Sequence, residues 1–208
     1  MGALGLLIAY VSGSFPSAYL AGRLLKGVDL RTVGSGNLGT TNVYRELGAW
    51  PAVVVLILDA LKGALPAAIL PGLLGTGFSS AAAAAWWGLA YGAAAIAGHS
   101  KSIFLLAKGG GKGVATAAGV FLALTPTAAL STIGLFAVVV SVTRFVSLAS
   151  IVGALTMPIA QLLTGGVTPF FYASLPLAAF VCWGHRSNVA RLRAGTEPRF
   201  GKPGKVSA

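Results

Sequence analysis

The sequence has very few acidic residues and little charge of any kind. Only 4 of its 208 residues are Asp or Glu, and charged residues make up 9% of the chain. Soluble domains average about 25% charged residues, so this composition, with 56% hydrophobic residues, indicates an integral membrane protein. The 15 Lys and Arg residues come without a basic helix carrying interleaved aromatics, which excludes nucleic-acid binding. We interpret the basic balance as membrane orientation together with an anionic substrate.

Cysteine and histidine are also scarce. The single cysteine, Cys182, cannot form an intrachain disulfide and lies in an apolar run, as a small core residue would. His99 and His185 belong to no Cys/His cluster, so no metal site is expected. Neither histidine is followed at short spacing by Asp, which excludes the familiar histidine–aspartate acyltransferase arrangement.

Long apolar runs predict membrane-spanning helices, which need roughly 20 residues each. The runs are Ala3–Leu25, Ala49–Leu70, Ala81–Ala97, Val114–Val142, Leu148–Leu163 and Pro169–Trp183. Pro126 interrupts the fourth run, and proline both disfavours helix at the preceding residue and begins helices well. From length alone, this run is either one kinked helix or two short passes.

The distribution of Lys and Arg favours two passes. Apart from Lys62, all of them lie at 23–45, at 101–112, at Arg144 or at 186–205, and none lies at 71–80 or 164–168. The positive-inside rule places the basic regions in the cytoplasm, which requires the fourth run to cross twice. We therefore predict an all-α membrane protein with seven transmembrane helices, two of them short. The N-terminus is outside and the C-terminus cytoplasmic, with one domain over residues 1–200 and a disordered tail at 201–208.

The most polar stretch of the chain is V-G-S-G-N-L-G-T-T-N-V-Y-R at 33–45. Its glycines allow backbone amides to approach a ligand closely, and consecutive exposed amides form a concave site for anions. Hydroxyl and amide side chains add directional donors, and Arg45 supplies a planar fork suited to phosphate. The alternative is a plain polar loop between two membrane helices, since loops are commonly rich in Gly and Asn.

A second glycine-rich segment, K-G-G-G-K-G at 108–113, runs directly into an apolar helix. Free amides and the positive end of the helix dipole make such a segment suited to anions. It is not a Walker A loop, because Leu106 and Gly113 stand where Gly and Ser or Thr are required.

Two further polar sites follow, one with Arg144 and Ser147, the other with His185 and Asn188. On the predicted topology all four polar sites lie at the cytoplasmic membrane face, which favours binding of more than one phosphate.

One ionic pair lies inside an apolar run. Asp59 and Lys62 have i,i+3 spacing, so they share a helix face and can neutralise each other. A pair that fixes helix packing and a direct catalytic role are both open from the sequence.

Together these motifs resemble the bacterial membrane-integral glycerol-3-phosphate acyltransferases that use acyl phosphate, the PlsY family. The resemblance covers essentially the whole chain and rests on V-D-L-R-x-V-G-S-G-N-x-G-x-T-N-V-x-R at 28–45, G-H…K-G-G-G-K-G-V-A-T at 98–116, R-F-V-S-L-A-S-I at 144–151 and H-R-x-N-V-x-R-L…G-x-E-x-x-F at 185–200. It implies transfer of a fatty acyl group from acyl phosphate to the sn-1 hydroxyl of glycerol 3-phosphate, giving lysophosphatidic acid and phosphate. The implied location is the bacterial inner membrane, and the implied transient partner is the soluble phosphate acyltransferase that makes acyl phosphate.

The resemblance also implies roles for individual residues. It places Ser35, Gly36 and Asn37 at the reacting acyl phosphate. Arg45 and Lys112 belong to the catalytic set as well and hold the glycerol 3-phosphate. Substrate binding is assigned to Thr41, Asn42, Lys108, Gly109, Gly110, Gly111, Gly113, Ser147, His185 and Asn188. No metal, no cofactor and no dedicated protein base are implied, so a phosphate oxygen of the substrate takes the hydroxyl proton.

The sequence departs from the family pattern in two places, the glycine segment and the residues after His99. The glycine segment is the first. It is one glycine longer than usual, which leaves open whether Lys108 shares the role of Lys112. The sequence Ser100-Lys101-Ser102 replaces the usual aromatic-proline pair after His99.

The rival class of function is a transporter for phosphate or organophosphate anions. Such a protein needs polar residues near the bilayer midplane and broken, paired helices. This chain instead collects its polar residues at one face, with only Asp59 and Lys62 deeper. An acyl chain dissolves in the bilayer and phosphates dissolve in water, so a site at the membrane surface favours the enzyme.

Overall fold

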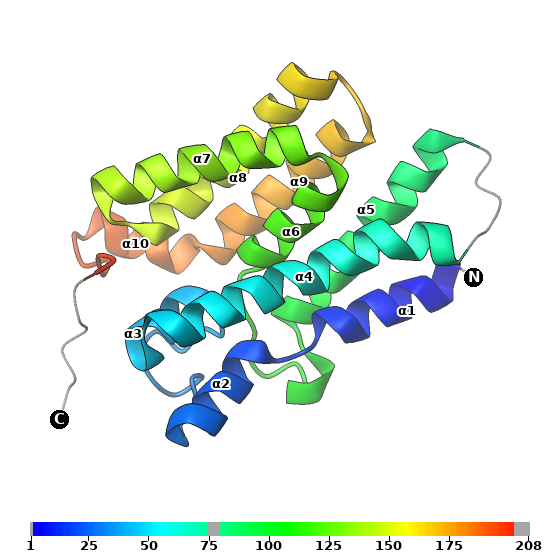
Figure 1. The fold of residues 1–208 in the computed structure, drawn as a ribbon. Coiled ribbons are helices and arrows are strands. Elements are labelled where there is room, and N and C mark those ends of the chain that lie inside the picture. The colour runs from blue at the N-terminus through cyan, green and yellow to red at the C-terminus, as the bar shows by residue number, and fades with distance from the viewer. Residues whose placement is uncertain (1, 75–79, 202–208) are drawn as a thin grey trace. The chain divides into compact units, whose positions relative to one another are not determined.

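The computed structural model describes residues 2–74 and 80–201, and every regular element in these residues is a helix (Figure 1). The chain forms two compact units, Met1–Leu124 and Thr125–Ala208, called here the N-terminal and C-terminal units. The N-terminal unit contains α1 (Gly2–Gly13), α2 (Ser17–Lys26), α3 (Thr40–Leu47), α4 (Ala49–Leu73), α5 (Ala81–Ser100), the 3-10 helix η1 (Ile103–Leu105) and α6 (Val114–Leu124). The C-terminal unit contains α7 (Pro126–Thr143), α8 (Val146–Gly165), α9 (Pro169–Gly184) and α10 (Arg186–Arg193).

The predicted apolar runs all form helices in the residues that are described. Five helical segments are long and apolar enough to cross a membrane: Gly2–Lys26, Ala49–Leu73, Ala81–Leu105, Pro126–Thr143 and Val146–Gly165. The apolar helices α6 and α9 are shorter. The fourth run is two helices and not one kinked helix, because α6 ends at Leu124 and α7 begins at Pro126. The single domain over 1–200 stays a prediction, and residues 202–208 of the predicted tail lie outside the described residues.

The first apolar run, predicted as one segment over Ala3–Leu25, is two helices, α1 and α2. Proline disfavours a helix interior, since it lacks an N–H and its ring clashes with the preceding turn. Here α1 ends at Gly13 and α2 begins at Ser17, directly after Pro16. The break frees backbone carbonyls that must find other donors. The Ser102 hydroxyl donates to the Ser14 carbonyl at 2.6 Å, and the Lys62 ammonium donates to the Phe15 carbonyl at 3.0 Å.

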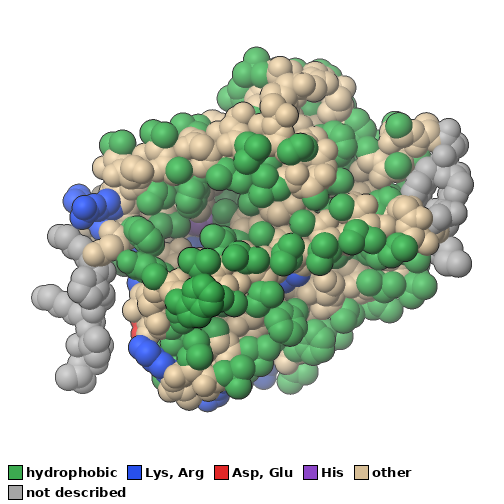
Figure 2. All heavy atoms as spheres, in the orientation of Figure 1, with side chains coloured by type: hydrophobic (Ala, Val, Ile, Leu, Met, Phe, Trp, Pro, Cys, Tyr) green, Lys and Arg blue, Asp and Glu red, His purple; other side chains and the backbone are tan. Residues whose placement is uncertain are grey.

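Helix α4 is the central element of the N-terminal unit and packs against α1, α3, α5 and α6 (Figure 1). Its buried residues recur at helical spacing along one face, from Ala52 to Leu70, and include Asp59 and Lys62. The opposite face exposes large apolar side chains such as Ile57 and leaves a hydrophobic surface over α1 and α4 (Figure 2). Such an extended apolar surface suits contact with lipid.

Close helix contacts in this unit use small residues. A Cβ at Gly119 on α6 would overlap the Ala60 carbonyl on α4, and one at Gly13 on α1 would overlap the backbone of Ala95 on α5. Small residues at helix interfaces let backbones approach closely. Membrane helices rely on such van der Waals packing because the hydrophobic effect does not drive their association in lipid.

The C-terminal unit is built on α8, which packs against α7 and α9, with α10 following α9. Gln161 is buried on α8 and donates to the Thr125 hydroxyl at 2.7 Å, which ties α8 to the start of α7. Arg144 connects α7 to α8 in the left-handed conformation, with φ of 61°. This turn brings the chain directly into the segment that carries Ser147.

Candidate active site

The polar loop, residues 27–39, is organised around Asn42 on α3. The buried Asn42 carboxamide accepts from the Ser35 amide at 2.9 Å and donates to the Leu30 and Val33 carbonyls at 3.2 Å each. The loop forms only part of its backbone hydrogen bonds within itself, as from Thr32 to Asp29. Asn42 pairs three further backbone groups, which would be costly to leave buried and unpaired. Asn42, predicted to bind substrate, therefore holds the backbone of the loop that carries Ser35.

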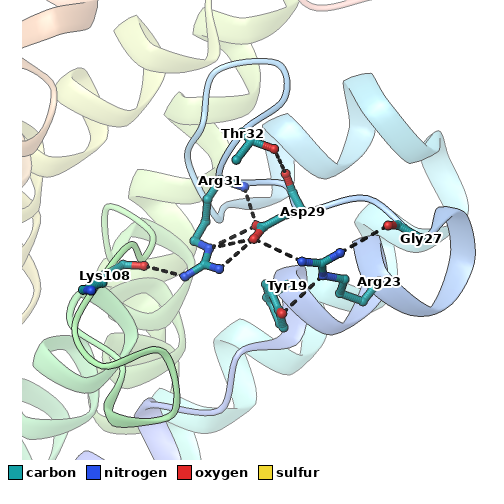
Figure 3. A network of polar contacts seen from close by, with 7 residues as sticks. All are labelled: Tyr19, Arg23, Gly27, Asp29, Arg31, Thr32 and Lys108. Carbon is teal, nitrogen blue, oxygen red and sulfur yellow. Dashed lines mark hydrogen bonds and ion pairs between the residues drawn. The ribbon is translucent and has the colours of Figure 1, made fainter.

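A second anchor of the polar loop is Asp29, shown in Figure 3. The Arg31 guanidinium donates to both carboxylate oxygens, with Nη2 2.6 Å from Oδ2, and the Arg23 Nη2 lies 3.5 Å from the same oxygen. These side-chain hydrogen bonds from Arg31 lower the pKa of Asp29 from 3.8 to about 2. The contribution of this pair to stability is therefore complete above pH 3.8 and is lost only as the pH falls through about 2.

Arg31 also joins the polar loop to the glycine loop, residues 108–113. Its Nη1 donates to the Lys108 carbonyl at 3.1 Å (Figure 3), and the Leu38 amide donates to the Gly110 carbonyl at 3.3 Å. The two segments that the sequence singles out as anion sites therefore lie side by side, although 77 residues separate Arg31 from Lys108.

Within the glycine loop, different glycines are needed for different reasons. Gly109 and Gly113 have φ of 103° and 77°, a conformation that side chains rarely adopt. Gly110 and Gly111 instead lie against the end of α5, where a Cβ at Gly110 would overlap the Ser100 carbonyl and one at Gly111 would overlap the His99 ring. Gly113 leads into α6, because its carbonyl accepts the amide of Ala117 at 2.8 Å.

The predicted residues of the N-terminal unit lie in these two loops or on the adjoining helix α3. Ser35 and Lys108 are exposed, and a half-buried group lies around them: Gly36, Asn37, Thr41, Arg45, Gly109, Gly110, Gly111 and Lys112. Arg45 lies on α3 one turn after Thr41 and Asn42, hence on the same helix face. Lys and Arg side chains gather at this end of the unit, beside α2 and α3 (Figure 2).

A buried ionic cluster underlies the glycine loop. Asp59 is 1% exposed, and its Oδ1 accepts from the Ser17 hydroxyl at 2.6 Å and from the Lys62 ammonium at 2.8 Å. The pairing of Asp59 with Lys62 follows the sequence prediction. The Nδ1 atom of the buried His99 lies 3.7 Å from the same oxygen, so a carboxylate from another helix faces this histidine. This contact could not be predicted from local sequence, since Asp59 lies on α4 and His99 on α5.

Two of the three predicted residues of the C-terminal unit, Ser147 and Asn188, donate to one carboxylate, Glu197, for which the sequence predicts no role. Glu197 Oε1 accepts from the Ser147 hydroxyl and from the Asn188 amide, both at 2.6 Å. Its Oε2 accepts from the Arg191 Nε at 2.7 Å. His185 is buried nearby in sequence, with Nδ1 2.8 Å from the Val181 carbonyl. The G-x-E-x-x-F motif at 195–200 contained the signal, but a lone Glu near a chain end has no local pattern that reveals its partners.

The environment of Glu197 acts on its acidity in two directions. Burial raises the pKa of the carboxyl group, while hydrogen bonds from Ser147, Asn188 and Arg191, together with the Arg191 charge, lower it. The donors prevail, so the pKa lies below its usual 4.5 and Glu197 is a carboxylate at neutral pH.

Comparisons with known proteins agree with one another. A family model described as glycerol-3-phosphate acyltransferase matches residues 3–195. Two proteins named glycerol-3-phosphate acyltransferase are each 46% identical to the chain. The one from Synechococcus sp. (strain CC9902) aligns over 96% of both chains, and the one from Parasynechococcus marenigrum (strain WH8102) over 95% of this chain and 89% of its own.

Two solved structures are also similar, both of PlsY, an integral membrane glycerol 3-phosphate acyltransferase. The glycerol 3-phosphate form has a TM-score of 0.85 and 37% identity, covering 96% of each chain. The lysophosphatidic acid form has a TM-score of 0.83 and 36% identity, covering 96% of this chain and 95% of its own.

Proposed function

Because this chain belongs to the glycerol-3-phosphate acyltransferase family, we propose that it uses acyl phosphate as the donor that acylates glycerol 3-phosphate. The sn-1 hydroxyl oxygen attacks the acyl carbonyl carbon, and the bond between that carbon and the phosphate oxygen breaks. The hydroxyl proton passes to a phosphate oxygen, and the products are lysophosphatidic acid and inorganic phosphate. The reaction needs positioning and charge stabilisation, which a phosphate-binding site supplies.

The observation that carries this proposal is the joining of the polar loop to the glycine loop through Arg31 and Leu38. Two segments rich in backbone amides suit a substrate pair that brings two phosphates together, and each has a cationic side chain in it or close by in sequence, Arg45 or Lys112. An acyl phosphate and glycerol 3-phosphate are such a pair.

We assign the residues of the N-terminal unit to both phosphates. Ser35, Gly36 and Asn37 contact the acyl phosphate, while Arg45 and Lys112 stabilise the charge that develops during transfer. Thr41 and Asn42 on α3 bind substrate together with five residues of the glycine loop, Lys108, Gly109, Gly110, Gly111 and Gly113. In the C-terminal unit, Ser147, His185 and Asn188 hold glycerol 3-phosphate, with Glu197 fixing the first and last of these.

Activity of purified protein in detergent tests the donor and the metal-free chemistry together. Palmitoyl phosphate with glycerol 3-phosphate should give lysophosphatidic acid, palmitoyl coenzyme A should not replace it, and EDTA should leave the rate unchanged. The chain has four carboxylates, and Asp29, Asp59 and Glu197 each accept from protein donors instead of forming a joint site. Turnover with the coenzyme A ester alone would refute the donor, and loss on chelation that a divalent ion restores would refute the metal-free reaction.

We further propose that the protein spans the bacterial inner membrane seven times, with its N-terminus outside and its C-terminus in the cytoplasm. The five long segments and the shorter α6 and α9 provide the spans. The distribution of Lys and Arg supplies the orientation, and it places both glycine-rich loops where soluble glycerol 3-phosphate and the phosphate acyltransferase are found.

Cysteine labelling of whole cells measures this orientation. In a Cys182→Ala background, Val167→Cys should react with an impermeant maleimide from outside, whereas Lys101→Cys and Ser187→Cys should react only after the cells are opened. All three side chains are exposed, so reactivity reports sidedness instead of burial. Labelling of position 101 or 187 in intact cells would contradict the proposed topology.

A further inference from the structure

The buried ionic cluster and the glycine loop meet at a single residue, His99. Its carbonyl oxygen accepts the Gly111 amide at 3.2 Å, and a Cβ at Gly111 would overlap its ring at Nε2. The other ring nitrogen, Nδ1, lies 3.7 Å from Asp59 Oδ1. His99 therefore stands between a buried carboxylate on one side and the backbone of the glycine loop on the other.

Neutralising the Asp59 carboxylate does not explain why a histidine lies at position 99. Asp59 already has the Lys62 ammonium at 2.8 Å and the Ser17 hydroxyl at 2.6 Å on its Oδ1 atom. Burying an imidazole has a cost unless its polar atoms are used, and His99 is 7% exposed. Its ring edge faces Gly111, so the residue fixes the place of the loop and not only the charge of the cluster.

A small cavity marks the same junction. It has a volume of about 10 Å³, room for about one water molecule, and its lining includes Lys62, His99, Ser102 and Gly110. The cluster, the end of α5 and the glycine loop thus meet with almost no free space. In a closely packed region, a change of one methyl group is felt by its neighbours.

We propose that His99 is a positioning residue: anchored beside Asp59, its ring holds Gly111 so that the amides of the glycine loop keep the geometry that binds phosphate. The binding of phosphate by this loop rests on the proposed function. The contact between His99 and Gly111 does not. Gly111 is glycine because the ring occupies the space of a side chain, and Gly110 is glycine because the α5 backbone does so.

This difference between neighbouring glycines gives a double-mutant test with a matched control. Gly111→Ala should lower kcat/KM for glycerol 3-phosphate by about tenfold or more, mainly through KM. His99→Asn keeps an amide on the Asp59 side and removes the ring edge that a Cβ at position 111 would meet. In the His99→Asn background, Gly111→Ala should therefore lower kcat/KM by less than about threefold. Residues in contact show such non-additivity, while independent sites do not.

Gly110→Ala is the control, because its added Cβ meets the carbonyls of Ser100 and His99 and not the ring. It should lower kcat/KM by the same factor with His99 or Asn at position 99. An unchanged effect of Gly111→Ala in the two backgrounds would overturn the proposal. The proposal would also be overturned if His99→Asn reduced the loss of kcat/KM equally for Gly110→Ala and Gly111→Ala. That result would mean that His99→Asn loosens the whole loop.

A readout without turnover separates this proposal from the proposed function. Hydrogen exchange of residues 108–113 should rise in Gly111→Ala and return toward the wild-type rate in the double variant, even if the protein transfers no acyl group. The chain has only two histidines, so ring resonances of labelled protein add a test that needs no His99 variant. Gly111→Ala should shift the His99 ring signals and Gly110→Ala should not, and shifts of the opposite pattern would overturn the contact.

Discussion

Replacing Arg45 by lysine is expected to lower kcat/KM for glycerol 3-phosphate by about tenfold or more, and replacing it by alanine should lower it further. Lysine keeps the charge but offers a point donor, whereas arginine presents two parallel donors to a phosphate. A tenfold loss corresponds to about 1.4 kcal/mol, near the lower end for a hydrogen bond to a charged group. Arg45 is half-buried on α3, one turn after the Asn42 that holds the Ser35 amide, so its charge acts beside the polar loop.

Steady-state kinetics divide this loss between binding and catalysis. An increase in KM alone means that Arg45 contacts phosphate equally in the ground state and the transition state, while a fall in kcat means that the contact strengthens during transfer. The matched control is Arg193→Lys, the same change at an exposed residue of α10, which should leave both constants unchanged. A well-folded Arg45→Ala with wild-type kinetics would remove this arginine from the site.

Hydropathy predicted the apolar helices because a long apolar run is a local property of the sequence. It did not predict the short helices α3 and α10, which lie in polar segments. The interruption at Pro126 followed from proline chemistry, and it is present between α6 and α7. The break at Pro16 follows from the same chemistry, although hydropathy alone predicts one apolar run over Ala3–Leu25. What stabilises that break could not be read locally, since the donors come from Lys62 and Ser102, residues far along the chain.

In the candidate site as well, the local features could be predicted from the sequence and the tertiary contacts could not. Two glycine-rich segments were recognisable because an anion site needs exposed amides, a requirement met by residues adjacent in sequence. The contact between the two segments includes Arg31 of the V-D-L-R motif, which donates to the Lys108 carbonyl. That hydrogen bond joins residues far apart in the chain and could not be predicted from either motif. Likewise, the sequence suggested Ser147 and Asn188 as ligand groups, whereas the structure shows both donating to Glu197.

Buried hydrogen-bond partners are therefore the part that sequence patterns did not reveal. A motif indicates which polar groups need satisfying, and packing decides which group satisfies them. Asp59 and Lys62 were predictable as a pair because they are one turn apart on a single helix. Glu197 was not, because its partners come from α8 and α10 and from no common periodic pattern.

Replacing Glu197 should cause the largest loss of stability among the changes considered for the C-terminal unit. Alanine at this position leaves the donors of Ser147 and Asn188 without their acceptor. It also leaves Arg191 without its carboxylate. A buried donor left unsatisfied costs about 1–3 kcal/mol, so we expect a loss of about 3 kcal/mol or more. This is a large part of a typical stability of about 5–15 kcal/mol. Glu197→Gln keeps the shape and should lose less.

The pH dependence of unfolding separates the contribution of the Glu197 charge from that of its side-chain shape, which glutamine retains. Because the pKa of Glu197 is lowered in the folded protein, its contribution is complete above the ordinary pKa and disappears as the pH falls through the lowered value. Glu197→Gln should therefore lower the melting temperature in detergent at pH 7, and the difference from wild type should shrink toward low pH. Activity should fall with it, since Ser147 and Asn188 lose their fixed positions.

Ser147→Ala is the matched comparison for this last prediction, because it removes one donor to Glu197 and leaves no buried donor unpaired. It should lower the melting temperature much less than Glu197→Ala while still raising KM for glycerol 3-phosphate. Equal melting temperatures for wild type and Glu197→Ala at pH 7 would show that this carboxylate does not hold the C-terminal unit together. The positions of the Ser147 and Asn188 side chains would then have to be set by contacts other than their hydrogen bonds to Glu197.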